Sequence, residues 1–177
     1  VVEPVKPISL ADQAKQEYEK GNFAEAAKMF DQAARAYAAS KDELNAAEMK
    51  NNRSVSLLQA GRAKEALDVT EGTEQVFQQA GDLKRQGLAV GNRAAALEGL
   101  KNWREALAEY ERAAALLEQA GEGDMHSVVR KAAANLNLKL GRFTDSQMDV
   151  LDSLRLAEKP TLAQRIMKFL LRIGILR

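Results

Sequence analysis

Apolar and polar positions alternate along most of the chain with the period of an α-helix. The stretch 92–120 shows this pattern clearly, with two helical segments on either side of a short turn at Lys101. Within each segment apolar residues gather on one face and charged residues on the other. Small residues stand where the two segments would touch, so the helices can approach closely. The pattern therefore predicts a helical hairpin with a buried face on each helix.

This hairpin recurs along the chain at a fixed spacing. The turn between its two helices moves forty residues each time, to Gly21, Gly61, Lys101 and Gly141. Junctions between successive hairpins recur with the same spacing, at Lys41, Gly81 and Gly121. A Gly there can end a helix in the left-handed conformation, and the acidic residue that follows each junction suits the start of the next helix, as a cap or as a partner of the helix dipole. A constant spacing of this length indicates a repeat architecture.

The repeat divides the chain into predicted elements. Residues 1–8 are expected to form an extended leader because Pro4 and Pro7 oppose a helix, and Ser9 is expected to cap the first helix. The helices are predicted at 9–20, 23–40, 42–60, 62–80, 82–100, 102–120, 124–140 and 142–158. The array over residues 9–158 has its repeats at 9–40, 41–80, 81–120 and 121–158. After Pro160, a last helix at 162–173 belongs to a terminal segment, 159–177.

The repeats resemble the tetratricopeptide repeat (TPR). In the first repeat, the positions that carry the signature of this family are Ala14, Gly21, Phe23, Ala26, Phe30 and Ala33. In the third repeat they are Ala94, Trp103, Ala106, Tyr110 and Ala113. The second repeat departs from the signature at Thr70 and Thr73, where an aromatic residue and Ala are expected. The period exceeds the usual length of about 34 residues, and it is similar to that of the vesicle-fusion adaptor SNAP family and of Pins-type spindle-orientation scaffolds.

The resemblance implies an all-α fold, a right-handed α-solenoid of four TPR-like helix hairpins followed by a C-terminal capping helix. It also implies a concave groove, lined by the first helix of each hairpin, in which such proteins bind peptides. By alignment, the groove positions are Lys15, Tyr18, Asn51, Asn52, Val55, Asn92, Ala95, Lys131 and Asn135. An Asn amide carries donors and an acceptor, so a row of Asn can pair with the backbone of an extended peptide. The function expected from the resemblance is a non-catalytic module that binds a peptide or helix of a partner protein, and the alternative for the Asn row is a polar helix face wetted by solvent.

Some positions in the first helices have unusual side chains. Arg53 and Arg93 replace a residue that is usually a buried Leu, and we expect their stems to pack on apolar surface with the charged heads in water. Gly91, Ala95 and Gly99 share one face of the helix at 82–100. Their small size leaves room for a ligand backbone or for another helix.

The terminal segment is amphipathic but lies outside the repeat. Its narrow basic face consists of Arg165, Lys168 and Arg172. Its opposite, apolar face contains Leu162, Ile166, Phe169, Leu170 and Ile173. We expect this helix to cover the last repeat, as terminal helices of such arrays do. The wide apolar arc leaves two alternatives, a homodimer contact that would make the protein an oligomeric scaffold, or contact with a membrane surface. The contact residues would be Ile166, Phe169, Leu170 and Ile173.

Composition narrows the classes of function. The net charge is +1, from 26 basic and 25 acidic residues, which gives no general attraction to nucleic acid. Cysteine is absent, which excludes disulfides, thiolate catalysis and Cys-based zinc sites. The sole histidine, His126, is expected to be exposed at the start of a helix, and no catalytic or nucleotide-binding motif occurs. The sequence therefore predicts a protein that is not an enzyme and that has no cofactor and no metal site.

The sequence also bears on where the protein is found. No run of about 18 apolar residues occurs, so no transmembrane helix is expected. The chain begins with Val1 rather than Met, which suggests a processed or trimmed product. A cytoplasmic location is expected.

Overall fold

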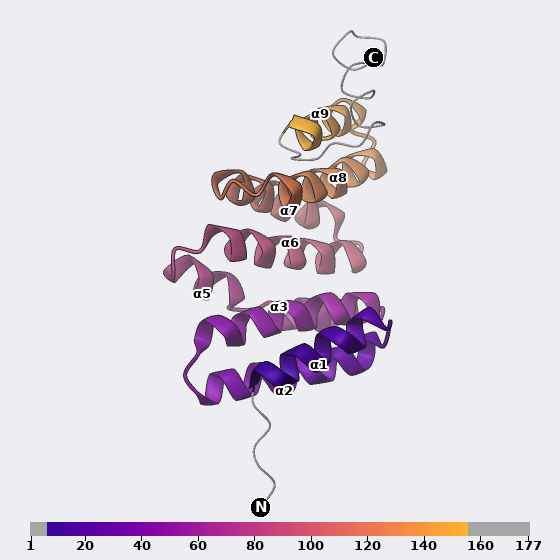
Figure 1. Ribbon diagram of the computed structural model, residues 1–177. Coiled ribbons are helices and arrows are strands. Elements are labelled where there is room, and N and C mark those ends of the chain that lie inside the picture. The colour runs from indigo at the N-terminus through magenta and orange to yellow at the C-terminus, as the bar shows by residue number, and fades with distance from the viewer. Residues whose placement is uncertain (1–6, 156–177) are drawn as a thin grey trace, which may run out of the picture.

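The computed structural model describes residues 7–155, and this part of the chain contains helices and turns but no strand (Figure 1). Its helices are α1 (Pro7–Glu19), α2 (Phe23–Ala39), α3 (Glu43–Gln59), α4 (Ala63–Val69), α5 (Thr73–Gln79), α6 (Leu83–Gly99), α7 (Trp103–Gln119), α8 (Gly123–Lys139) and α9 (Phe143–Arg155). The all-α class that the sequence predicts is confirmed for these residues.

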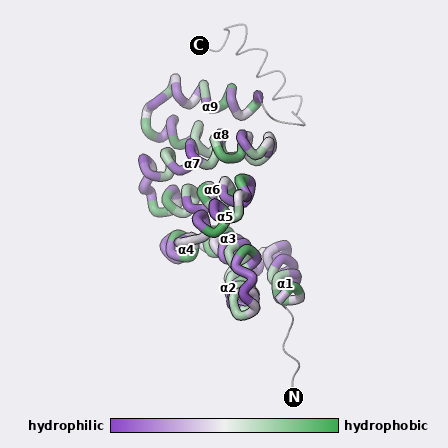
Figure 2. The backbone as a smooth tube through the Cα atoms, turned by 90° about the vertical axis from the view of Figure 1, so that its left-hand side faces the viewer, coloured by the Kyte–Doolittle hydropathy of each residue, from purple (hydrophilic) through white to green (hydrophobic). Residues whose placement is uncertain are grey.

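Helices that follow each other in the sequence pack side by side. The contacts join α1 to α2, α2 to α3, α6 to α7, α7 to α8 and α8 to α9. The stack continues through the middle of the chain because α3 contacts both α5 and α6. As a result, α1 and α9 lie at opposite ends of the stack in Figure 1. Figure 2 shows hydrophobic and hydrophilic residues alternating along the helices, as expected of helices that bury one face.

One residue in each turn between the predicted helices adopts a left-handed backbone conformation, and these residues recur every twenty positions. They are Gly21, Lys41, Gly61, Gly81, Lys101, Gly121 and Gly141, with φ between 60° and 81°. In each turn the following residue donates its N–H to the carbonyl five residues back, as Asn22 does to Glu17 at 2.9 Å. The left-handed residue itself bonds three residues back, so each turn is a Schellman motif. The forty-residue repeat in the sequence therefore corresponds to two units of helix and turn.

The first helix starts earlier than predicted. α1 begins at Pro7, so the prediction that Ser9 is its N-cap is wrong. Proline suits the first turn of a helix because its ring fixes φ at a helical value and because an N–H there would have no partner. Residues 1–6 of the predicted leader lie outside the described part of the chain.

Acidic residues after the junctions cap two of the helices. The Asp42 carboxylate accepts the N–H of Asn45 at 3.1 Å, and the Asp82 carboxylate accepts the N–H of Arg85 at 2.9 Å. Each bond satisfies one of the donors that the start of a helix leaves free. At the third junction, Glu122 makes no such bond with its side chain. The predicted caps are therefore present for α3 and α6, and the start of α8 differs.

The helix predicted at 62–80 is interrupted, so this prediction is wrong. α4 ends at Val69, and α5 begins at Thr73. Between them Gly72 has a φ of 78°, which a right-handed helix cannot contain. The Thr70 hydroxyl donates to the Leu67 carbonyl at 2.7 Å, and the Thr73 hydroxyl donates to the Thr70 carbonyl at 2.8 Å. These side chains bond to carbonyls that a continuous helix would pair with backbone N–H groups.

Small residues occupy the closest helix contacts. Ala26, Ala66 and Ala106 share one position of the repeat, and all three are fully buried. The largest apolar cluster joins α6, α7 and α8, and Leu117 lies within it. α9 contributes a single buried apolar residue, Leu154. Apolar burial therefore holds most of the stack together but contributes less at α9.

Candidate functional site

A small hollow lies between α1 and α3 at the first of the predicted groove positions. Its volume is about 210 Å³. Its lining consists of Lys15, Tyr18, Glu19, Phe30, Asn52 and Val55. Four of these residues are predicted from the sequence to line a peptide groove, and the fold brings them together from two helices.

Two lining residues are missed by the sequence analysis. Phe30 comes from α2 and is only 3% exposed, so in the sequence it cannot be told apart from other core residues. Glu19 is exposed and lies one helical turn after Lys15 on α1. That spacing is the signal that could have identified Glu19, because residues four apart share a helix face.

The polar groups around the hollow are available for a ligand. Neither the Tyr18 hydroxyl nor the Asn52 amide makes a hydrogen bond with another described residue. The Tyr18 ring packs edge-on against Phe23, with 5.2 Å between the ring centroids, which fixes its direction. Lys15 lies 4.0 Å from Asp12 with both side chains largely exposed, which makes this a weak pair. The hollow thus combines an apolar lining with free donors and acceptors.

Asn51 does not lie in an open groove. It is buried, and its Oδ1 has no hydrogen-bond partner among the described residues. A Cβ at Gly91, the same repeat position forty residues later, would lie 3.7 Å from Val129 and 3.8 Å from Ala113. This helix position therefore faces the neighbouring helices, which corrects the placement of Asn51 in the groove.

The remaining predicted groove residues lie away from the hollow. Asn92 and Ala95 on α6 are half-buried, whereas Lys131 and Asn135 on α8 are exposed. None of these four residues lines the hollow between α1 and α3. Gly99 on α6 approaches another helix rather than a ligand space, because a Cβ there would lie 2.8 Å from the Cβ of Ala63 on α4.

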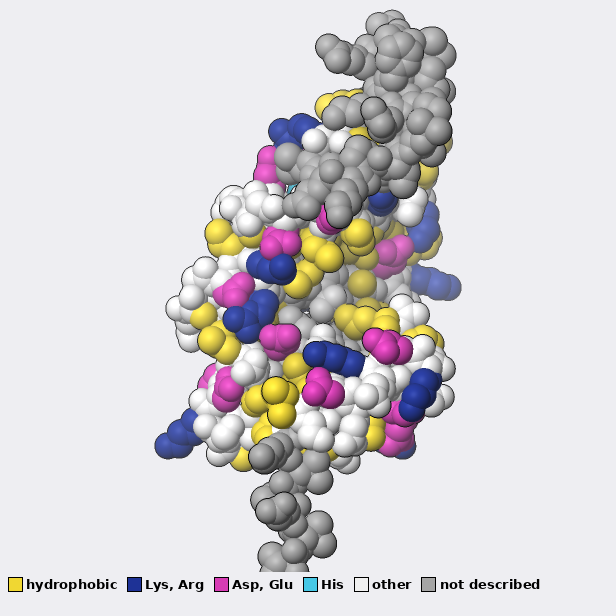
Figure 3. Space-filling model, viewed as in Figure 1, with side chains coloured by type: hydrophobic (Ala, Val, Ile, Leu, Met, Phe, Trp, Pro, Cys, Tyr) yellow, Lys and Arg dark blue, Asp and Glu magenta, His cyan; other side chains and the backbone are white. Residues whose placement is uncertain are grey.

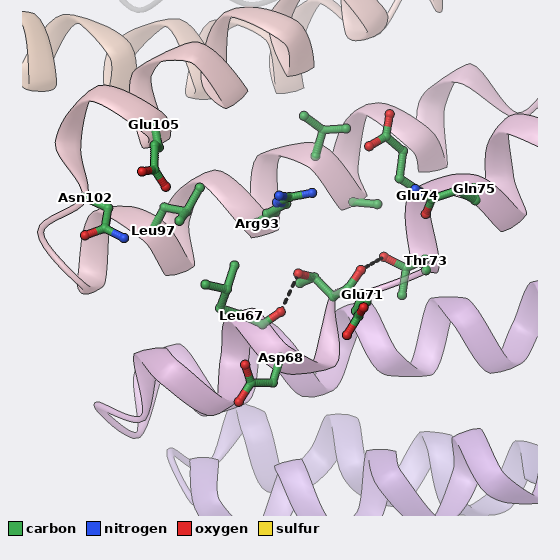
Figure 4. A pocket seen from close by; sticks show the side chains of 14 residues that line it. Leu67, Asp68, Glu71, Thr73, Glu74, Gln75, Arg93, Leu97, Asn102 and Glu105 are labelled. Atoms are coloured by element: carbon green, nitrogen blue, oxygen red, sulfur yellow. Dashed lines mark hydrogen bonds between the residues drawn. The ribbon is translucent and has the colours of Figure 1, made fainter.

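Two further clefts have linings related to each other, and the sequence analysis misses both. The first has a volume of about 270 Å³ and is lined by Ala27, Lys28, Asp31, Gln32, Arg53, Leu57 and Arg62. Each of these residues has a counterpart forty positions later in the second cleft, whose volume is about 460 Å³. The second cleft opens beside the interruption between α4 and α5 (Figure 4). The substitutions at Thr70 and Gly72 are the sequence signal that could have indicated it.

The two clefts hold their arginines differently. Arg53 donates its Nη1 to Asp31 at 2.5 Å, so its charged head is paired rather than free in water as predicted. In the second cleft Glu71 takes the position of Asp31, but it lies in the interruption between α4 and α5. Arg93 is exposed, as predicted, and makes no ion pair with any other described residue. Figure 4 shows Arg93 on the α6 wall of this cleft.

His126 is buried, so the prediction that it is exposed is wrong. Its side chain has 0% exposure and lies near charged residues of α8 and α9. Its place near the start of α8 gave no sign of this burial, because the sequence pattern does not show how α9 packs on this end of α8. The predicted contacts of the terminal segment lie outside the described residues. They are Ile166, Phe169, Leu170 and Ile173.

Charged side chains of both signs are interspersed over the face of the molecule in Figure 3. Some of these charges connect helices. Glu98 on α6 accepts the Tyr110 hydroxyl at 3.1 Å and pairs with Lys139 at 2.9 Å, which ties α6 to α7 and α8. Burial and the nearby Glu98 raise the pKa of the Tyr110 hydroxyl, so Tyr110 remains a hydrogen-bond donor at neutral pH.

No protein-family model matches the chain, and no curated protein matches it. Within residues 7–155, no helix is long and apolar enough to cross a lipid bilayer. Over the same residues, no group of three or more acidic or histidine side chains is arranged to hold a metal ion. The geometry of the hollow is therefore the basis for the functional proposal.

Proposed function

We propose that the chain is a TPR-like, right-handed α-solenoid that binds an extended segment of a partner protein without catalysing a reaction. The regular turns every twenty residues and the packing of consecutive helices support this architecture. In such an array α1, α3, α6 and α8 are the first helices of the four hairpins and line one concave surface. The partner segment lies along that surface.

The hollow between α1 and α3 is the observation that carries the proposal. It offers apolar surface from Tyr18, Phe30 and Val55 beside the unpaired amide of Asn52. An extended peptide has matching groups, because its apolar side chains gain from burial and its backbone N–H and C=O groups need partners. One apolar side chain of the partner enters the hollow, and the Asn52 amide pairs with the adjacent peptide backbone.

Asn92 extends this mode of contact to the next repeat. It stands forty positions after Asn52, it is half-buried, and its amide makes no hydrogen bond with another described residue. A peptide that bonds to Asn52 can continue along the same surface toward α6. Lys131 and Asn135 on α8 are exposed and provide polar contacts further along.

Selection from a library of displayed random peptides tests this function directly. Peptides that bind the full chain would be synthesised, and their dissociation constants would be measured by calorimetry for the wild type and for Val55→Glu. The new carboxylate would be buried by the ligand, so we expect affinity to fall at least about tenfold, which corresponds to about 1.4 kcal/mol. The double variant Asn52→Ala with Asn92→Ala should also weaken binding while the melting temperature stays unchanged.

The matched control is Arg104→Ala, because Arg104 is exposed on α7 and lines neither the hollow nor either cleft. This variant should bind the selected peptides as the wild type does. Equal affinity of the wild type and Val55→Glu for every selected peptide would contradict binding at the hollow.

A further inference from the structure

α9 is attached to the stack mainly by polar groups. Its buried residues are Ser146, Asp149, Ser153 and Leu154, of which only Leu154 is apolar. The large apolar cluster that joins α6, α7 and α8 contains no residue of α9. Since apolar burial is the main stabilising contribution in most helix contacts, the docking of α9 depends unusually strongly on charges and hydrogen bonds.

A set of ion pairs connects α9 to the two helices before it. Arg130 on α8 contacts Asp149 at 3.1 Å and Asp152 at 2.7 Å. Asn137 donates to the other oxygen of Asp149 at 2.7 Å. Arg155 reaches Glu118 on α7 at 2.6 Å. These contacts join α9 to both α7 and α8 through charged and polar side chains.

His126 lies inside this set of charges with an incomplete set of partners. Its Nε2 is 3.5 Å from Asp152 Oδ2 and 3.5 Å from the Nε of Arg130. Its Nδ1 is buried and has no hydrogen-bond partner among the described residues. In the neutral imidazole with its hydrogen on Nε2, facing Asp152, the buried Nδ1 carries no hydrogen. Protonation adds an N–H at Nδ1 that has no acceptor and a positive charge beside Arg130.

The charged groups that face His126 come from three helices. Glu118 lies on α7, Arg130 on α8, and Asp152 and Arg155 on α9. The net effect of the surroundings is to lower the pKa of His126, and burial is the largest cause. The carboxylates of Asp152 and Glu118 raise this pKa in part. The positive charges of Arg130 and Arg155 lower it further. Asp152 offsets the burial incompletely because it also pairs with Arg130 and Arg155.

The sign of the pH effect follows from this lowered pKa. Above the pKa of an unfolded histidine, near 6.5, the imidazole is neutral whether α9 is docked or released. As the pH falls below that value, the released state binds a proton that the docked state resists. The equilibrium then shifts toward release by up to about tenfold per pH unit, the limit for one proton.

We propose that the α8–α9 contact is a pH-sensitive latch, in which a proton taken up by His126 releases α9 from α8 while the earlier helices remain folded. The release is local because each unit of a stacked array contacts only its neighbours. α9 packs on α8 at one end of the described stack (Figure 1), so its release leaves the contacts from α1 to α8 in place.

The experiment uses the single histidine of the full chain. The imidazole C–H signal and the backbone amide signals would be followed by NMR from pH 8 to pH 5. We expect the imidazole and the amides of α9 (Phe143–Arg155) to change with one midpoint below pH 6.5, while the amides of α2 stay constant. The indole N–H of Trp103, the sole tryptophan, serves as an internal control for α7.

Two variants separate the latch from general acid instability. His126→Gln keeps a polar side chain, and His126→Phe keeps a ring, but neither titrates in this range. Each variant is first checked for docked α9 at pH 8. In a variant that passes this check, α9 should stay docked down to pH 5. The latch is refuted if α9 stays docked in the wild type at pH 5. It is equally refuted if imidazole and α9 midpoints differ, if α2 and α9 unfold together, or if the variants release α9 at the wild-type pH.

Discussion

Arg53 and Arg93 occupy the same position of two successive clefts, but only Arg53 is held by an ion pair. α2 is continuous, so Asp31 on this helix reaches Arg53. The counterpart of Asp31 is Glu71, which lies where the chain is interrupted between α4 and α5. A local interruption of one helix has therefore left Arg93 on the opposite wall without a partner among the described residues.

This difference should appear in the stability of two matched variants. Arg53→Ala removes a half-buried ion pair and the packing of the stem, so we expect the free energy of unfolding to fall by about 1–2 kcal/mol. Arg93→Ala removes an exposed, unpaired side chain, and its effect should stay below about 0.5 kcal/mol. Urea denaturation of the two variants and the wild type measures both values. Equal losses would contradict the difference between the clefts.

Two glycines on α6 should respond in opposite ways to an added methyl group. At Gly99 a Cβ would lie 2.8 Å from the Cβ of Ala63, so Gly99→Ala must push α4 and α6 apart, at a cost of about 1–3 kcal/mol. At Gly91 the nearest atoms are at 3.7 Å, an ordinary contact. Gly91→Ala should therefore stabilise the protein by about 0.5–1 kcal/mol, because Ala favours a helix more than Gly does. Thermal unfolding followed by circular dichroism gives the sign of each change.

Lys101 is strained by its place in the turn between α6 and α7. Its φ is 64°, in a region that a residue with a Cβ adopts at a cost, whereas Gly61 fills the same turn in the preceding repeat. Lys101→Gly should stabilise the protein by about 0.5–1 kcal/mol, since the relieved strain is partly offset by greater freedom of the unfolded chain. Gly61→Lys should destabilise it by a similar amount. The idea fails if both variants change the urea midpoint in the same direction.

The cap of α6 should contribute to stability only above acidic pH. The backbone N–H of Arg85 lowers the pKa of Asp82, and the Arg85 side chain lowers it further. A carboxyl whose pKa is lower in the folded protein than in the unfolded chain stabilises the fold at pH values above its unfolded-state pKa. This stabilisation is lost as the pH falls through the pKa that the carboxyl has in the folded protein. Asp82→Asn should therefore show a smaller loss of stability than the wild type when the pH is lowered from 6 toward 2.

Glu111→Gln provides the control for that measurement. Glu111 is exposed on α7 and makes no hydrogen bond or ion pair with another described residue. Its replacement should leave the slope of stability against pH close to that of the wild type. A slope that changes equally in both variants would show that net charge, rather than the cap, produces the effect.

The sequence by itself determined the features that depend on local backbone energetics. The turns were predictable because a Gly after a helix lowers the cost of a positive φ, and because an Asp such as Asp42 can bond the first N–H groups of the next helix. Four of the predicted groove residues also meet in one hollow, since a strict period places equivalent residues on equivalent faces.

Only the tertiary structure decided which side chains those faces bury and where they leave space. Asn51 and His126 look like surface residues in the sequence, yet neighbouring helices cover both. The cleft beside the interruption at Gly72 is also decided by tertiary structure, because Arg93 and Leu97 on α6 form its other wall. The physical reason is that burial depends on how closely a neighbouring helix approaches, and a local pattern gives a helix its apolar face but not the distance to the helix that packs on it.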